Sequence, residues 1–279
     1  MSTKDFTANV ISASKVVPDG NFKDSKASGI WDINEALDLI KGGNWPNVAN
    51  INPAAFVDGL FSTFLYEGNG GTQTITNNIN LSGSGGLVWI KNRDDSYANA
   101  LTDTARGGGF YLEAENNGAQ PTSAATNNIT SFNTNGFSIG NRADINANAN
   151  SHVSWTFRKQ PKFFDIVTYT GNGTAREIAH NLGTTVGFMI IKKTSQTGDW
   201  MSFHRSATGK WLKLNDTDAA TTNVAAEVFG NDSSYIAPSS TVFSVGSETS
   251  VNASNQTYVA YLFAHNNDDG GFGEPGDQD

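Results

Sequence analysis

Hydrophobic and polar residues alternate in short runs along most of the chain. Val153, Trp155 and Phe157 would project from one side of a strand, while the intervening Ser154 and Thr156 would project from the other. Runs of this kind recur about every 8 to 12 residues, and turns rich in Gly and Asn separate them. The pattern predicts an all-β fold of the sandwich or jelly-roll type.

The runs form two sets that match in order. Each set contains aromatic residues, a Tyr, a Gly-Asn-Gly turn and, further on, an apolar strand that ends in Ile-Lys. The offset stays at roughly 100 residues and drifts by a few where the loops differ, as expected of a duplicated fold. The matching segments are 61–91 with 163–192, 110–112 with 210–212, 136–140 with 242–246, and 153–157 with 259–263.

We therefore predict two tandem, duplicated β-sandwich domains with a jelly-roll or concanavalin-like arrangement. The first domain covers residues 56–160 and the second covers residues 161–265. The connection at residues 158–162 is short and contains Pro161, so the two domains should pack with little freedom. Residues 266–279 form an acidic, Gly-rich tail.

Residues 1–55 have a different pattern and carry the one predicted helix, at about residues 32–41. Asp32 is a suitable N-cap with Glu35 three residues later, and Gly42 follows the last turn. A helix of about three turns is too short to be stable alone in water. Its apolar face should therefore dock on another surface.

Composition and charge narrow the functional classes. The 279 residues carry a net charge of -9 and a pI of about 4.8, which disfavours nucleic acid as a partner because an acidic surface repels phosphates. The chain has no Cys, which excludes disulfide and thiol chemistry. No apolar run approaches the roughly 18 to 20 residues of a membrane span, and the first residues lack a signal-peptide core. We expect no membrane insertion.

Two glycine patterns are better explained by structure than by chemistry. Residues 136–140 match the G-x-S-x-G nucleophile pattern, but they read as an alternating strand and their match begins with Val242. The Gly-Asn-Gly turns at residues 68–70 and 171–173 lack the third Gly and the helix of a dinucleotide site. Hairpin turns that need positive φ explain them better.

Acidic residues and histidines give no catalytic or metal-binding pattern. The four His lack metal-ligand spacing, and the Asp-Asp pairs at 94–95 and 268–269 lack a calcium-loop pattern. Glu113 and Glu115 lie on one predicted strand, and their counterparts in the second set are Lys and Asn, so a glycosidase-type carboxylate pair is disfavoured. We predict no cofactor, no metal and no enzymatic activity.

Several segments taken together suggest a family. They are residues 86–91, 131–137, 155–158, 163–167, 180–183 and 258–263. Together they resemble tandem-repeat β-sandwich structural proteins of tailed bacteriophages, in particular phages of marine bacteria and cyanobacteria. Residues 29–35 with 43–46 also resemble a short segment that recurs in phage tail-associated proteins.

This resemblance implies a non-enzymatic structural protein of the virion, either a fibre or a decoration of the capsid or tail. Its partners would be other virion proteins of the capsid, neck or tail, and copies of itself, with a trimer favoured by analogy with fibres. The protein would be made in the host cytoplasm and located in the virion. Residues 1–55 would be the docking segment, and its candidate contact residues are Trp31, Leu37, Ile40 and Trp45.

Two other functions stay open. A carbohydrate-binding, lectin-like module is the alternative, with loops around Trp200 or Tyr97 holding a host-surface glycan. Trp200, His204 and Arg205 form the one polar–aromatic cluster that looks exposed and could stack on a sugar, although ordinary packing at a strand edge also explains it. A glycan-degrading enzyme is the third hypothesis.

Overall fold

The computed structural model describes residues 57–265 apart from 122–124 and 223–226. These residues belong to one compact unit that begins at Val57. For clarity we call residues 57–160 the first half and residues 161–265 the second half. The predicted helix at 32–41 and the tail at 266–279 lie outside the described residues.

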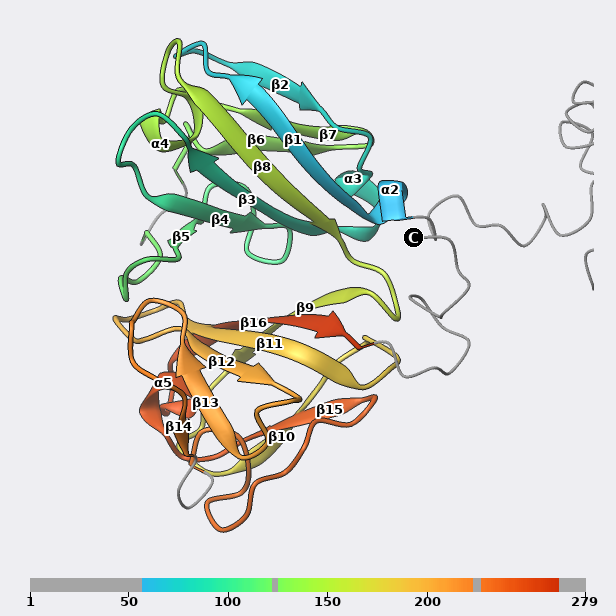
Figure 1. The fold of residues 1–279 in the computed structure, drawn as a ribbon, viewed down its shortest axis with the longest axis vertical. Coiled ribbons are helices and arrows are strands. Elements are labelled where there is room, and N and C mark those ends of the chain that lie inside the picture. Colours follow the sequence, from blue (N-terminus) through green and yellow to red (C-terminus); the bar gives the residue numbers. More distant parts are fainter. Residues whose placement is uncertain (1–56, 122–124, 223–226, 266–279) are drawn as a thin grey trace, which may run out of the picture. The chain divides into compact units, whose positions relative to one another are not determined.

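The first half contains a five-stranded and a three-stranded antiparallel sheet (Figure 1). The larger sheet has the order β1 (Phe61–Glu67), β8 (Ser151–Arg158), β3 (Gly86–Asn92), β4 (Asn99–Asp103) and β5 (Leu112–Glu113). The smaller sheet has the order β2 (Gln73–Thr76), β7 (Gly136–Ile139) and β6 (Ile129–Asn133). The helical turns are α2 (Val57–Leu60), α3 (Leu81–Ser84) and α4 (Ala143–Asn146).

The second half contains a six-stranded and a two-stranded antiparallel sheet. The larger sheet has the order β14 (Thr221–Thr222), β13 (Lys210–Lys213), β12 (Met201–His204), β11 (Val186–Lys193), β16 (Thr257–Ala264) and β9 (Phe164–Thr170). The smaller sheet pairs β10 (Arg176–Ala179) with β15 (Val242–Val245). The one helical turn described here is α5 (Thr249–Asn252).

The two large sheets share an order of pairing. Strands β1, β8, β3, β4 and β5 of the first half match β9, β16, β11, β12 and β13 of the second. Trp155 lies between Thr63 and Trp89 in the first register. Tyr261 lies between Ile166 and Ile190 in the second. We call residues at the same place in the two registers counterparts.

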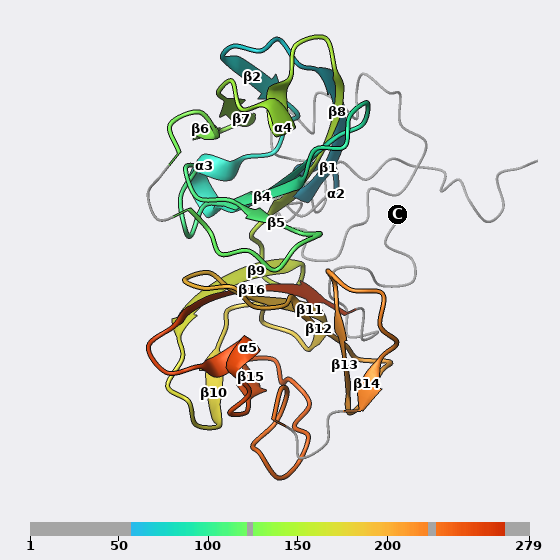
Figure 2. The ribbon, with the colours of Figure 1, turned by 90° about the vertical axis from the view of Figure 1, so that its left-hand side faces the viewer.

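Three apolar clusters hold the described residues together. One lies between the sheets of the first half and includes Val88 and Phe137. Another lies between the sheets of the second half and includes Met189 and Phe243. The third lies between the two large sheets, and we call it the joint (Figure 2). Its buried residues are Leu87, Leu101, Leu112, Ala114, Phe164, Ile166, Ile190, Trp200, Val259 and Tyr261.

Strand alternation explains how one strand serves two clusters. Val88 and Ile90 of β3 point into the cluster of the first half, whereas Leu87 and Trp89 point from the opposite face toward the joint. Both faces of each large sheet therefore contribute to apolar packing. Burying both faces removes more apolar surface from water than burying one, which stabilises the fold by about 25 cal/mol for each additional Å².

The all-β prediction is confirmed, because the regular secondary structure of the described residues consists of antiparallel strands with only a few short helical turns. The matched segments at 136–140 and 242–246 contain β7 and β15, and those at 153–157 and 259–263 lie within β8 and β16. The strands of the two halves therefore occur in the same order as the matched segments of the sequence.

The Gly-Asn-Gly turns are only partly as predicted. Gly70 and Gly173 have positive φ values of 66° and 75°, as expected of a turn glycine. The strands that flank each turn do not pair with each other, however, because β1 pairs with β8 and β2 pairs with β7. The prediction of a hairpin was therefore wrong: each turn carries the chain from the large sheet to the small one.

Candidate functional site

Aromatic rings from both halves fill the joint near the connection between them. Phe157 of β8 lies 5.5 Å from Phe164 of β9 and 5.4 Å from Phe263 of β16, measured between ring centroids. Phe164 also stacks on Tyr261 at 6.4 Å. Such ring pairs add about 1 kcal/mol beyond their buried area. The ring cluster and the covalent connection therefore restrain the same end of the joint.

A buried ion pair of the first half forms hydrogen bonds across the joint. Asp103, which is fully buried, accepts hydrogen bonds from Arg106 Nε at 2.6 Å and from the Tyr261 hydroxyl at 2.8 Å. Arg106 Nη2 donates to the Tyr261 oxygen at 3.0 Å. Burial raises the pKa of Tyr261 well above its ordinary value, so the phenol stays a neutral donor. Two residues of the first half thus hold one residue of the second.

Trp200 provides a second polar link. Its side chain is fully buried, and Nε1 donates to the backbone oxygens of Glu113 and Asn116, each at 3.0 Å. Both acceptors belong to the first half. A fully buried ring offers no face to a sugar, so the prediction that Trp200 contacts a glycan was wrong. Sequence alone could not show this, since an aromatic residue beside polar ones fits an exposed and a buried site equally well.

Lys192 is a buried cation beside this link. Its Nζ donates to the Lys193 oxygen at 2.8 Å and to the Asn117 oxygen at 3.3 Å, and it lies 5.9 Å from the Trp200 ring centroid. Burial, together with the nearby charges of Lys193 and Arg106, lowers the pKa of Lys192 to about 8. The ammonium is thus held by carbonyl dipoles in a site that disfavours its charge.

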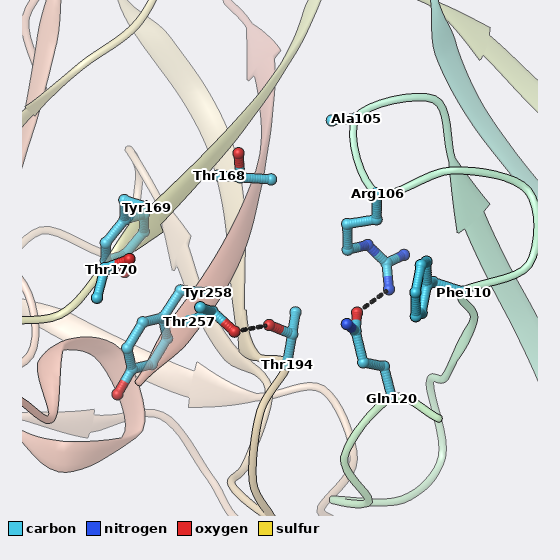
Figure 3. Close-up of a pocket in the computed structure, with 10 residues that line it drawn as sticks. All are labelled: Ala105, Arg106, Phe110, Gln120, Thr168, Tyr169, Thr170, Thr194, Thr257 and Tyr258. Carbon is cyan, nitrogen blue, oxygen red and sulfur yellow. Dashed lines mark hydrogen bonds between the residues drawn. The ribbon is translucent and has the colours of Figure 1, made fainter. Parts of the chain in front are cut away.

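A pocket of about 340 Å³ opens at the edge of the joint (Figure 3). Arg106, Phe110 and Gln120 lie on one side of it, and threonines and tyrosines of the second half lie on the other. Arg106 Nη1 donates to Gln120 Oε1 at 3.3 Å. No carboxylate lines the pocket among the described residues, and the charge of Arg106 is already paired with Asp103. The lining therefore suits a neutral hydroxylated ligand better than an ion.

A smaller pocket of about 210 Å³ lies at the connection between the halves. Lys159 Nζ lies 3.0 Å from Asp165 Oδ1, and Asp165 is buried. The two carboxylate oxygens of Asp165 also accept the backbone N–H groups of Ile166 and Asn181, at 2.9 and 2.8 Å. The lining of this pocket is thus engaged in holding the connection against β9.

A matching hydrogen-bonded tyrosine occurs at the end of the first strand of each half. Tyr66 donates to the Ile145 oxygen at 2.7 Å, and Tyr169 donates to the Val251 oxygen at the same distance. In each case a second ring stacks on the tyrosine at 5.1 Å, contributed by His152 in the first half and by a tyrosine in the second. These bonds tie the end of the first strand of each half to its helical turn.

One fully buried asparagine completes the same motif in each half. Asn146 Nδ2 donates to the oxygens of Gly71 and Gly140, at 2.8 and 2.9 Å. Asn252 Nδ2 makes the counterpart bonds at 2.7 and 2.8 Å. Each Oδ1 also accepts a backbone N–H from the Gly-Asn-Gly turn. The motif fixes the turn that links the two sheets of each half, which is a structural role.

The remaining predicted residues are dispersed. His204 and Arg205 are exposed at the end of β12, and the His204 ring lies 6.3 Å from Phe188. Tyr97 is 40% exposed. The structure does not join any of these to Trp200 in one open site. The docking candidates Trp31, Leu37, Ile40 and Trp45 lie outside the described residues.

The nucleophile pattern and the acidic pair at residues 94–95 likewise give no reactive group, and the pair at residues 268–269 lies outside the described residues. Ser138 lies within β7, where its Oγ is 3.0 Å from Thr74 Oγ1 and accepts from Asn133 Nδ2 at 3.0 Å. The described residues contain no group of three or more His, Asp or Glu side chains that could hold a metal. None of the helices in these residues could span a membrane.

Sequence reasoning expected the two domains to pack with little freedom but missed the residues that form the joint, although β16 contained a signal. Residues 258–263 are apolar or aromatic throughout, and a continuous run of this kind is typical of a strand buried on both faces. Asp103 and Arg106 gave no such signal, because a lone acidic residue three positions before an arginine is common on surfaces. Their counterpart region holds the exposed His204 instead.

Comparison with known protein families yields a match over most of the chain. A family model described as a domain of unknown function (DUF7483) matches residues 58–274, which is more than three quarters of the chain. This match spans both halves and the joint between them. No curated protein and no solved structure matches.

Proposed function

The chain belongs to the DUF7483 family, and we propose that it is a non-enzymatic structural protein of a tailed-phage virion, acting as a fibre or as a decoration of the capsid or tail. The sequence resemblance described above motivates this role. The observation that carries it is the joint: an apolar interface reinforced by the Asp103–Arg106–Tyr261 network, which suits a rigid projecting element. A spacer on a particle needs stiffness more than it needs a cleft.

We further propose that the halves are duplicated β-sandwich modules fused into one body. The paired motifs of Tyr66 with Asn146 and of Tyr169 with Asn252 support this, because the same bonds recur at the same place in each register. Gene duplication explains such a repeat more simply than independent origin. The joint then adds a contact that a string of separate modules would lack.

We propose that residues 1–55 attach the protein to the particle. The contact residues of this segment would be Trp31, Leu37, Ile40 and Trp45. The test is incorporation of tagged protein into purified particles, read by immunogold electron microscopy. Full-length protein should label the particles, and a variant without residues 1–55 should stay folded and fail to label them. Particles that never contain the full-length protein would contradict the virion role, whereas equal labelling by both forms would contradict only the docking segment.

Glycan binding is a second candidate function, favoured by the pocket at the edge of the joint. Its threonine hydroxyls, the Gln120 amide and the Phe110 ring offer the mixture of polar and aromatic contacts that neutral sugars use. A glycan array tests it. Binding that is lost in Phe110→Ala and Thr170→Ala, but kept in His204→Ala, would support this pocket. Binding that depends on His204 would place the sugar elsewhere.

A further inference from the structure

The joint is not symmetric, although the two large sheets are built alike. The second half contributes the face of β9 and β16, including Ile166, Val259 and Tyr261. The first half contributes a different part of its own sheet, including Leu101 and Leu112 of β4 and β5. The strand faces that form the joint in one half therefore have counterparts in the other half that do not pack in the joint in the same way.

The first unused surface lies on β1 and β8 of the first half. Thr63, Leu65 and Trp155 project there on the same side as Phe157, since residues two apart share a face and directly paired residues do too. Leu65 is 60% exposed, and Trp155 is partly exposed. We call these three residues the β1 surface. The counterparts of Thr63 and Trp155 are Ile166 and Tyr261, which the joint buries.

The second unused surface lies at β13 of the second half. Leu212 pairs with Ser202 just as Leu112 pairs with Leu101. The backbone N–H of Leu214 bonds to the Trp200 oxygen, as the N–H of Ala114 bonds to the Asn99 oxygen. Leu212 and Leu214 are thus counterparts of two joint residues, and we call them the β13 surface. Ala114 is 5% exposed, whereas Leu214 is 38% exposed.

These surfaces account for two of the three large hydrophobic residues that are exposed in the described residues, Leu65 and Leu214; the third is Tyr97. The counterpart of Leu65 is Thr168, which is also exposed. The repeated fold alone therefore does not require a leucine at this place. Apolar side chains that are exposed next to one another, as opposed to singly, mark interaction sites.

We propose that a second copy of this chain docks here, with its β13 surface against the β1 surface of the first. The two surfaces are the counterparts of the two sides of the joint, so the contact would repeat between chains the packing that already exists within one. Figure 1 shows that β1 and β13 belong to different halves. The contact is consequently head-to-tail, which generates a ring or a filament of copies rather than a two-fold dimer. It does not depend on the virion role.

The test uses the full chain and measures mass by sedimentation velocity over a wide concentration range. Leu65→Glu and Leu214→Glu each place a charge in the contact and should each weaken association about tenfold or more. Thr168→Glu is the matched control, because it introduces the same charge at the counterpart of Leu65, and it should leave the mass unchanged. Unchanged unfolding temperatures show that the variants are folded, as expected for exposed positions.

Mixing the two variants separates a head-to-tail contact from a two-fold one. Leu65→Glu keeps an intact β13 surface and Leu214→Glu keeps an intact β1 surface, so their mixture should form a pair that neither forms alone. Wild-type protein that does not self-associate would overturn the proposal. So would variants that associate as wild type does, a loss with only one of the two, or a mixture that fails to pair.

Discussion

Tyr66 in the first half and Tyr169 in the second donate the same hydrogen bond at the same 2.7 Å, whereas the counterparts Asp103 and His204 share nothing. Asp103 is fully buried and bonds across the joint. His204 is exposed. The residues that are alike in the two halves stabilise each half by itself. The residues that differ between the halves determine the contacts across the joint.

The same contrast holds for the pair of lysines that end the matching apolar strands. Lys91 is partly exposed and donates to the Tyr97 oxygen. Lys192 occupies the counterpart position, is fully buried and bonds to the first half through Asn117. The repeated order of strands thus places a lysine in two different environments. Packing at the joint buries Lys192, whereas Lys91 stays partly exposed.

The largest effect should come from the buried ion pair. Asp103→Ala leaves the Arg106 charge buried without its carboxylate and the Tyr261 hydroxyl without its acceptor, and should lower the free energy of unfolding by about 3 to 5 kcal/mol. His204→Ala, at the exposed counterpart, should change it by less than about 0.5 kcal/mol. Urea denaturation of both variants measures the difference. If both variants lowered the free energy of unfolding by equally small amounts, the ion pair would not stabilise the joint.

A smaller effect, equal in the two halves, is expected from the matching asparagines. Asn146→Ala and Asn252→Ala each remove a buried amide that bonds to two carbonyls and an N–H, and should each cost about 2 to 4 kcal/mol. The same denaturation experiment compares them. Costs that differ by more than a factor of two would mean that the two motifs, despite their matching distances, do not support their halves equally.

Lys192 should give the next effect, and it depends on pH. Its pKa is lowered by burial to about 8, below the 10.5 expected of an unfolded lysine, so the unfolded chain binds this proton more tightly. Stability should therefore rise between about pH 8 and pH 10, by on the order of 1 to 3 kcal/mol. Lys192→Met should abolish that rise, and Lys91→Met should keep it. A rise that survives Lys192→Met would assign the titration to another group.

Much of each half could be predicted from sequence because its physics is local. Alternation along residues 153–157 and 259–263 predicts strands, and the strands are there. The sequence predicted that the Gly-Asn-Gly turns need positive φ, and Gly70 and Gly173 have it. The sequence could not distinguish a hairpin from a crossing between sheets, since both need the same glycine.

The joint could not be predicted because its chemistry comes from residues far apart in the chain. Asp103 and Tyr261 are 158 positions apart, and neither is unusual for its own strand. Trp200 was assigned to an exposed cluster because its neighbours are polar, but its indole N–H bonds to backbone oxygens more than 80 residues away. Alternation with a period of two shows which residues share a face of a strand, but it does not show which segment packs on that face.

The central claim is that the joint makes the two halves one cooperative unit. Hydrogen exchange of the full chain, read on peptides from β8 and β16, tests it most directly. The slowest amides of both strands should report the same free energy of opening, and Asn252→Ala should lower both values by the same amount although it lies in the second half. A decrease confined to β16, with β8 unchanged, would contradict the claim.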